Sequence, residues 1–282
     1  MLLNLHAPTP LEYFASLVQS DDELPLLETA ISLAQDEYPE LDLQEPLLAV
    51  ESLQSRLRRR CDRSASVLER IRLLNRFFYG ELGFSVNRND YYDPENSFLH
   101  AVLQSRRGIP ISVGLLWLEL ARGIGLDAHG VSFPGHFMLK VLLAQGQVVL
   151  DPLTGKSFSS EELTEQLQSQ IPRLSLVSDD VVPLAMFLQS ARPREIIARM
   201  LRNLKEIYRT QHDAQRLLAV QQRLVVLLPQ DWAELRDRGW AHLELEHTQQ
   251  AMADFETYLD HARDASDTQQ VAQKLRDLRT LS

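Results

Sequence analysis

The stretch of residues 106–155 constrains the fold of this chain most. Gly108 and Pro110 interrupt the preceding structure, and the run from Val113 to Ile124 is apolar on nearly every side. Such a run predicts a helix buried in the centre of a domain, not one lying on its surface. Short apolar segments bounded by turn residues follow, and they predict three strands at residues 127–133, 136–143 and 147–150.

Three polar residues lie at the ends of these elements. Ser112 stands where the helix should begin and is expected to cap it, His136 begins the second strand, and Asp151 follows the third. In this chain order they could act as nucleophile, general base and orienting acid. Each also has a plainer interpretation: serine often caps helices, a lone strand histidine is usually a packing residue, and aspartate before proline favours a turn.

Four short phrases give these residues a wider context: Asn96-Ser97-Phe98-Leu99, Arg107-Gly108-Ile109-Pro110-Ile111-Ser112, Pro134-Gly135-His136-Phe137 and Leu150-Asp151-Pro152. With them the stretch resembles the core of the transglutaminase-like superfamily, and more closely its bacterial SirB-type branch. The resemblance implies an α+β fold in which a helical lobe and a small antiparallel sheet form a papain-like core. It also implies a cysteine at the start of the central helix, a histidine on one strand and an aspartate on the next.

The position that should hold the nucleophilic cysteine carries Ser112, and its neighbours Pro110 and Ile111 are not nucleophiles either. A thiolate forms readily beside an imidazole, whereas a serine hydroxyl needs a stronger supporting arrangement. The only cysteine, Cys61, lies far upstream and is interpreted as an ordinary thiol on a helix face. This departure favours a degenerate site over an active enzyme.

Composition excludes several classes of protein. One cysteine excludes a disulfide framework and fits a reducing compartment. The N-terminus MLLNLHAPTP has neither the basic region nor the apolar run of a signal peptide, and no stretch approaches the ~18 apolar residues of a membrane span. The net charge of −10 disfavours nucleic acid as a partner. We therefore expect a cytoplasmic protein that binds neither nucleic acid nor membrane.

Charge is distributed unevenly along the chain. Eleven acidic residues and no Lys or Arg precede Arg56, and five arginines then follow at positions 56, 58, 59, 60 and 63. This pattern predicts that the acidic segment pairs with the basic one within the molecule, while a local anion site at the arginines is the alternative. The acids of loop 87–96 miss the ligand spacing of a calcium loop. We expect no metal and no cofactor.

Apolar residues recur with helical periodicity in the N-terminal and C-terminal parts of the chain. Upstream it predicts helices near 10–20, 24–38, 47–60 and 64–83. A helix at 161–170 and a proline-containing connector at 171–193 are expected after the strands. Downstream, helices are predicted near 194–211, 213–228, 231–246, 248–263 and 267–280.

The downstream helices show a weak self-match at a period of 34 residues, which places Ala219 on Ala253. That period is typical of tetratricopeptide repeats, which the region resembles. Two such units and one further helix are too few for a free-standing solenoid, so we expect them to dock on the first domain. The predicted domains are therefore 1–192, transglutaminase-like with N-terminal helices, and 193–282, an all-α repeat region.

Three functions remain open at this point. The favoured one is a non-catalytic or degenerate transglutaminase-like protein that binds a peptide or protein through its cleft or its repeats. The alternative is an amide or ester hydrolase or acyltransferase, with Ser112 as nucleophile, His136 as general base and Asp151 as its orienter. The third is an assembly factor that acts through the repeats alone. In a degenerate catalytic centre, a cysteine placed at position 112 is expected to alkylate rapidly.

Overall fold

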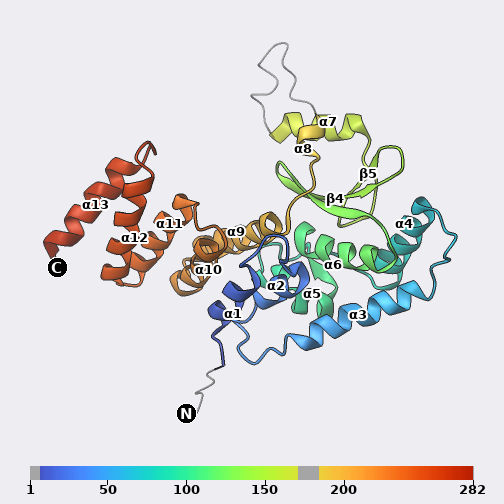
Figure 1. The fold of residues 1–282 in the computed structure, drawn as a ribbon, viewed down its shortest axis with the longest axis horizontal. Helices are drawn as coiled ribbons and strands as arrows, with labels where there is room; N and C mark the ends of the chain where they lie inside the picture. The colour runs from blue at the N-terminus through green and yellow to red at the C-terminus, as the bar shows by residue number, and fades with distance from the viewer. Residues whose placement is uncertain (1–6, 171–183, 282) are drawn as a thin grey trace. The chain divides into compact units, whose positions relative to one another are not determined.

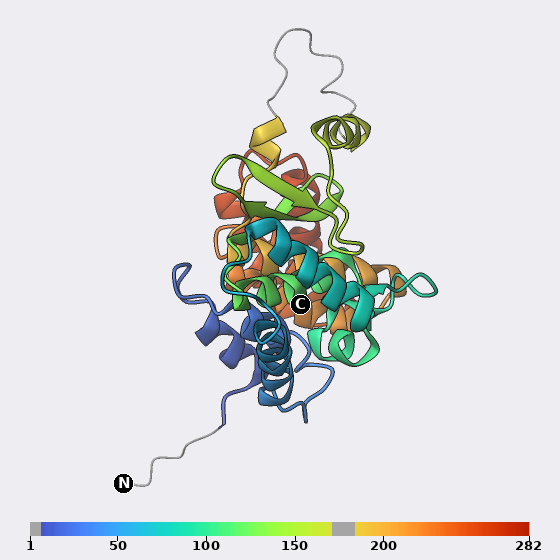
Figure 2. The same cartoon turned by 90° about the vertical axis from the view of Figure 1, so that its right-hand side faces the viewer.

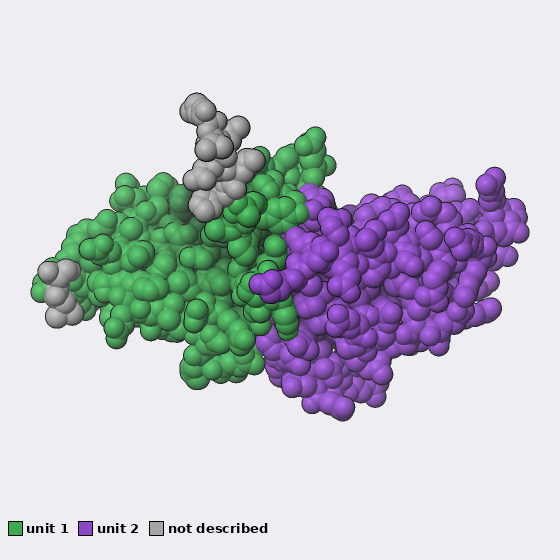
Figure 3. Space-filling model, turned by 90° about the horizontal axis from the view of Figure 1, so that it is seen from below, with its two compact units in different colours: residues 1–24, 35–39, 201–282 green, residues 25–34, 40–200 purple. Residues whose placement is uncertain are grey.

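A computed structural model describes residues 7–170 and 184–281 (Figure 1). The contacts divide the chain into two compact units, coloured separately in Figure 3. One comprises residues 25–34 and 40–200, and the other residues 1–24, 35–39 and 201–282. The domain boundary expected between residues 192 and 193 stays a prediction. Part of the expected connector, residues 171–183, lies outside the described residues.

The larger unit contains a helical lobe and a small antiparallel sheet, as expected for an α+β fold. Its central element is α6 (Pro110–Gly123), which is buried without interruption from Ile111 to Ala121. The predicted central helix is therefore confirmed. The other elements of the lobe are α2 (Leu26–Ser32), α3 (Gln44–Arg58), α4 (Val67–Asn75) with its π-helical continuation η1 (Arg76–Glu81), β1 (Ser85–Val86), η2 (Pro94–Ser97), α5 (Leu99–Ser105) and β2 (Arg107–Gly108).

The start of α6 differs from the expectation. The helix begins at Pro110, with Ile109 as its N-cap residue, so Ser112 lies inside the first turn and is not the cap. Proline is favoured at the first helical position because its fixed φ suits the helix and its missing N–H would have no helical partner there. The N-cap therefore lies three residues upstream of the position expected from the sequence.

The three predicted strands are confirmed as β3 (Ala128–Phe133), β4 (His136–Leu142) and β5 (Gln147–Leu150), which pair antiparallel in that order. Strands β3 and β4 form a tight hairpin, and Leu139 of β4 is opposite Leu150 of β5. One face of the sheet packs on α6, and the other is covered by α7 (Ser160–Gln170) and α8 (Leu184–Phe187) (Figures 1 and 2).

Helix α2 is shorter than the helix expected at residues 24–38. Residues after Leu33 form turns, and residues 35–39 belong to the smaller unit. There Asp36 pairs with Arg223, and Glu37 accepts a hydrogen bond from the Tyr208 hydroxyl. These tertiary contacts hold the segment away from helical geometry.

The expected pairing between the acidic N-terminal segment and the arginines at 56–63 is wrong. Within the described residues, the only carboxylate that pairs with any of these arginines is Glu81, which contacts Arg60 at 2.6 Å. Asp36 and Glu37 instead pair with Arg223 and Arg216 of the smaller unit. The arginine-rich segment is therefore left with most of its charge unneutralised.

All the regular secondary structure in the described part of the smaller unit is helical. This unit contains α1 (Pro10–Leu17), the C-terminal part of α9 (Pro193–Gln211), α10 (Ala214–Leu227), α11 (Trp232–Glu244), α12 (Thr248–His261) and α13 (Thr268–Leu281). Helices α10 to α13 pack successively on one another and α1 packs on α10. Helices α10 and α12 begin 34 residues apart (248 − 214), as the repeat predicts. Phe255 packs against Gly239, where a Cβ would lie 2.6 Å from its ring. No helix in the described ranges combines the length and apolarity needed to cross a membrane.

We predict that Gly155, in the turn after β5, cannot accept a side chain. Its φ is +68°, and a Cβ would lie 2.5 Å from Cε2 of Tyr79 and 2.7 Å from Nδ2 of Asn75. Gly155→Ala should lower the free energy of unfolding by about 1–2 kcal/mol through backbone strain, and by roughly 1–3 kcal/mol more through overlap. Urea denaturation measures the loss.

Gly146→Ala is the matched control, because Gly146 has a φ of +84° and no atom within 4 Å of a built Cβ. Gly146→Ala should lower the free energy of unfolding by the contribution of backbone strain alone. Equal losses in the two variants would contradict the close packing of this turn on α4 and η1.

Candidate functional site

His136 and Asp151 lie together at one end of the sheet. His136 is the first residue of β4, and Asp151 directly follows β5, the adjacent antiparallel strand. The distance from His136 Nε2 to Asp151 Oδ2 is 3.6 Å, and the two side chains are 28% and 21% exposed. This is slightly longer than a hydrogen bond and short enough for a direct electrostatic contact. The predicted proximity of the two side chains is confirmed.

Asp151 is held by its own turn. Its Oδ1 accepts hydrogen bonds from the backbone N–H groups of Leu153 at 2.7 Å and Thr154 at 2.9 Å, which leaves Oδ2 directed at His136. Burial alone would raise the pKa of Asp151, but the interaction with His136 and the hydrogen bonds from these two N–H groups outweigh it and lower the pKa. The carboxylate therefore stays ionised and can fix the orientation of the imidazole.

A second set of side chains supports this turn from the helical lobe. The Tyr79 hydroxyl donates to the Pro152 carbonyl at 2.9 Å, and Asn75 Nδ2 donates to the Gly155 carbonyl at 3.0 Å. Trp117 Nε1 of α6 donates to Asn75 Oδ1 at 2.9 Å. Burial, followed by the nearby charge of Asp151, raises the pKa of Tyr79, so the hydroxyl remains a donor.

Sequence reasoning missed Tyr79, Asn75 and Trp117. Tyr79 and Asn75 lie in the segment 64–83, which the sequence predicts only as a helix. The available signal was Asn75 itself, a polar side chain beside the apolar residues Ile71, Leu74 and Phe78 of that segment. A buried polar side chain needs a partner, but the sequence does not say which one.

Ser112 is not joined to this pair. Its side chain is 0% exposed, and its Oγ lies 2.6 Å from the Asn96 carbonyl, to which it donates. The same oxygen accepts from the backbone N–H of Ile109 at 3.1 Å. A hydroxyl has a single proton to donate. Within the described residues Ser112 forms no hydrogen bond with His136.

The geometry of α6 explains this separation. A Cβ on Gly114 would lie 3.0 Å from Cε1 of Phe137 and 3.1 Å from Cβ of Pro152, so position 114 faces the residues that follow His136 and Asp151. Successive residues of an α-helix are about 100° apart, which turns Ser112 roughly 200° away from Gly114. Pro110 is only about 40° from Gly114 by the same rule. The first-turn position on the side of the His–Asp pair is therefore a proline.

Among the described residues, the His136 imidazole and the Asp151 carboxylate are the side chains at this end of the sheet suited to proton transfer. The pair can accept and hold a proton. Within the described part of the chain, no group of three or more His, Cys, Asp or Glu side chains is arranged to hold a metal ion. Nor does any described serine, threonine or cysteine side chain hydrogen-bond to His136.

Comparison with known proteins identifies the family. The family model of the transglutaminase-like superfamily matches residues 45–202, more than half of the chain. The chain belongs to the transglutaminase-like superfamily. A tetratricopeptide repeat model matches residues 204–276, in the region where the 34-residue period was observed.

Bacterial relatives extend over most of the chain. A UPF0162 protein of Xylella fastidiosa (strain Temecula1) is 37% identical over 246 residues, which cover 86% of both chains. A UPF0162 protein of Pseudomonas aeruginosa is 30% identical over 255 residues, 90% of each chain. Protein SirB1 of Salmonella typhimurium is 28% identical over 238 residues, 83% of this chain and 77% of its own. The resemblance to the SirB-type branch is confirmed.

We predict that Asp151→Asn destabilises the fold in a pH-dependent way. At pH 7 the variant should lose about 1–2 kcal/mol, because Asp151 receives hydrogen bonds as a charged acceptor. A lowered pKa contributes stability that is present above the unfolded value of about 3.9 and is lost as the pH falls through the folded value. Urea denaturation should therefore show the difference between wild type and variant shrinking as the pH falls below about 4.

Asp127→Asn serves as the control, because Asp127 forms an exposed pair with His129, with side chains 66% and 37% exposed. Exposed pairs contribute about 0–1 kcal/mol. A cost of Asp151→Asn that stays constant from pH 7 to the lowest pH at which the protein folds would contradict the assigned hydrogen bonding.

Proposed function

We propose that this protein is a non-catalytic member of its family, in which a degenerate transglutaminase-like domain accompanies repeats that bind a protein or peptide. The observation that carries the proposal is the position of Ser112. Its hydroxyl is fully buried and donates to the Asn96 carbonyl. Helical geometry turns position 112 about 200° from position 114, which faces Phe137 and Pro152. A general base needs its nucleophile within hydrogen-bond reach. A side chain fixed on the other side of α6 does not meet that requirement.

The match to tetratricopeptide repeats supports a role in protein interaction. A cavity of about 300 Å³ opens among α9, α10 and α11, lined in part by Lys205, Arg209, Trp240 and Glu244. It is at the lower end of small-molecule sites, so it suits one or two side chains of a bound peptide. Lys205 already pairs with Glu234 and Asp237. The cavity therefore offers Trp240 as an apolar contact and Arg209 and Glu244 at its rim.

The Ser–His–Asp hydrolase or acyltransferase remains the second candidate. Its support is the His136–Asp151 contact at 3.6 Å and the ionised state of Asp151. It requires that Ser112 leave its buried hydrogen bonds and that α6 turn about its axis. The cytoplasmic location expected from the single cysteine stays a prediction, as does the absence of a nucleic-acid partner.

We predict that Ser112 shows no activated reactivity. Wild-type protein should not be labelled at Ser112 by a fluorophosphonate probe. In Ser112→Cys the new thiol is buried, so iodoacetamide should modify it more slowly than Cys61, which is only partly buried. Adding His136→Ala should leave that rate unchanged. Peptide mapping separates the two cysteines, and thermal melting checks that the variants fold.

The opposite result would support the arrangement expected from the sequence, with position 112 beside His136. Rapid alkylation of the introduced thiol at mildly acidic pH, slowed by His136→Ala, would place the thiol beside the imidazole. The proposal that Ser112 is held away from the His–Asp pair would then be abandoned.

The repeat cavity can be tested by photo-crosslinking. Arg209 and Glu244 are each replaced by a benzoylphenylalanine residue in the full-length chain expressed in bacterial cells. Both positions should give a discrete cross-linked product with one polypeptide, because they border the same cavity. Arg263, exposed and outside the cavity, is the control position. Equal products from all three positions, or none from the first two, would argue against a docking site there.

A further inference from the structure

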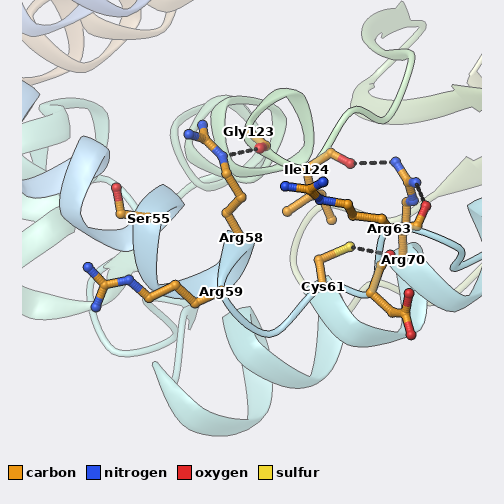
Figure 4. A pocket seen from close by; sticks show the side chains of 9 residues that line it. Ser55, Arg58, Arg59, Cys61, Arg63, Arg70, Gly123 and Ile124 are labelled. Carbon is orange, nitrogen blue, oxygen red and sulfur yellow. Dashed lines mark hydrogen bonds between the residues drawn. The ribbon is translucent and has the colours of Figure 1, made fainter.

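A second cavity, of about 480 Å³, lies in the larger unit and is unrelated to the His–Asp pair (Figure 4). It is bounded by the C-terminal end of α3, the segment leading to α4, and the C-terminal end of α6. Its charged lining consists of Arg58, Arg59, Arg63, Arg70 and Asp62. Four positive charges and one negative charge leave a net +3 (4 − 1) in a protein whose overall charge is −10.

Two of these arginines are fixed in place by neutral groups. Arg58 Nε donates to the Gly123 carbonyl at 3.0 Å, and Arg70 Nη1 donates to the Ile124 carbonyl at 2.8 Å. Both bonds, drawn in Figure 4, satisfy backbone carbonyls at the C-terminal end of α6. A purely structural role therefore accounts for Arg58 and Arg70, but neither is neutralised by a carboxylate.

That structural role does not extend to Arg59 and Arg63. In the part of the chain that is described, neither guanidinium has a hydrogen bond or an ion pair. In Figure 4 Arg63 extends toward Ile124, between Arg58 and Arg70. The one carboxylate in the lining, Asp62, accepts from the backbone N–H and hydroxyl of Ser64, both at 2.8 Å. Figure 4 shows Arg58, Arg63 and Arg70 around Gly123 and Ile124, with the Arg59 side chain directed away from them. Like charges that line one cavity repel one another unless an anion accompanies them.

We propose that this cavity binds a small molecule that carries a phosphate group. Guanidinium groups present paired N–H donors that match phosphate oxygens, and two of the four are already oriented by α6. The cavity volume falls in the range of small-molecule sites and exceeds what one phosphate ion fills. The inference is independent of the function proposed above, because it uses none of the residues of the His–Asp pair or the repeats.

Cys61 provides a built-in reporter. It is the only cysteine of the chain, it lines the cavity, and it is partly exposed. Iodoacetamide is uncharged and is therefore not attracted by the arginines. Its rate of reaction with Cys61 in the full-length wild-type protein reports how accessible the cavity is. Inorganic pyrophosphate is the probe, and sodium chloride at equal ionic strength controls for screening.

Pyrophosphate at about nine times its dissociation constant occupies about nine sites in ten and should therefore slow alkylation of Cys61 about tenfold. The double variant Arg59→Gln/Arg63→Gln should raise the concentration for half-protection at least tenfold, since each charged hydrogen bond contributes appreciably. Arg72 is an exposed arginine on the same helix as Arg70 and outside the cavity lining. Arg72→Gln should therefore leave the pyrophosphate concentration for half-protection unchanged. Calorimetric titration with pyrophosphate should give the same order of affinities for the wild type, the double variant and Arg72→Gln.

Several outcomes would overturn the proposal. Protection that sodium chloride reproduces, or that the double variant retains in full, would show that the arginines hold no specific anion. If pyrophosphate neither protected Cys61 nor gave a heat of binding, the cavity would likewise hold no specific anion. A phosphoserine peptide and a phosphorylated sugar are tested beside pyrophosphate. Protection by the peptide alone would replace the small molecule with a modified protein, and protection by pyrophosphate and the sugar would support the assignment.

Discussion

The burial of α6 is the constraint on which the larger unit depends. Eleven consecutive residues, Ile111 to Ala121, are withdrawn from water, and Trp117 at their centre is 0% exposed. Each fully buried large apolar side chain contributes roughly 1.5–3 kcal/mol, so this one helix supplies a large share of the unit's hydrophobic stabilisation. The sheet packs on one side of it and α3 on another, where Gln54 Nε2 donates to the Glu119 carbonyl at 2.7 Å.

The same helix also positions the polar end of the sheet. Trp117 donates to Asn75, and Asn75 donates to the Gly155 carbonyl in the turn that Asp151 begins. A hydrogen-bonded path therefore runs from the core of the lobe to the carboxylate that faces His136. Such buried networks are rigid when every member is satisfied. The orientation of the His–Asp pair is thus set by packing far from the pair itself.

Much of this architecture was predictable because it depends on local patterns. The uninterrupted apolar run predicted the central helix, and the turn residues predicted the three strands. The position of His136 and Asp151 at strand ends predicted that their side chains lie close together. The start of α6 was not predicted correctly, because Ser112 resembles a cap and Pro110 resembles a breaker, whereas proline also begins helices. The partners of the arginines at 56–63 depend on long-range packing, which charge order along the chain does not encode.

The direction of Ser112 shows why a motif in the right order need not be a catalytic site. Order along the chain places a residue within about one helical turn, but a helix rotates each position by about 100°, so an offset of two residues moves a side chain to the opposite face. Ser112 Oγ lies beside the Asn96 carbonyl and Gly108, and changing the rotamer leaves the side chain on the same face of the helix. Only rotation of the whole helix would bring the hydroxyl round, and that would expose a face that is buried throughout. The packing that stabilises the fold thus opposes the serine mechanism.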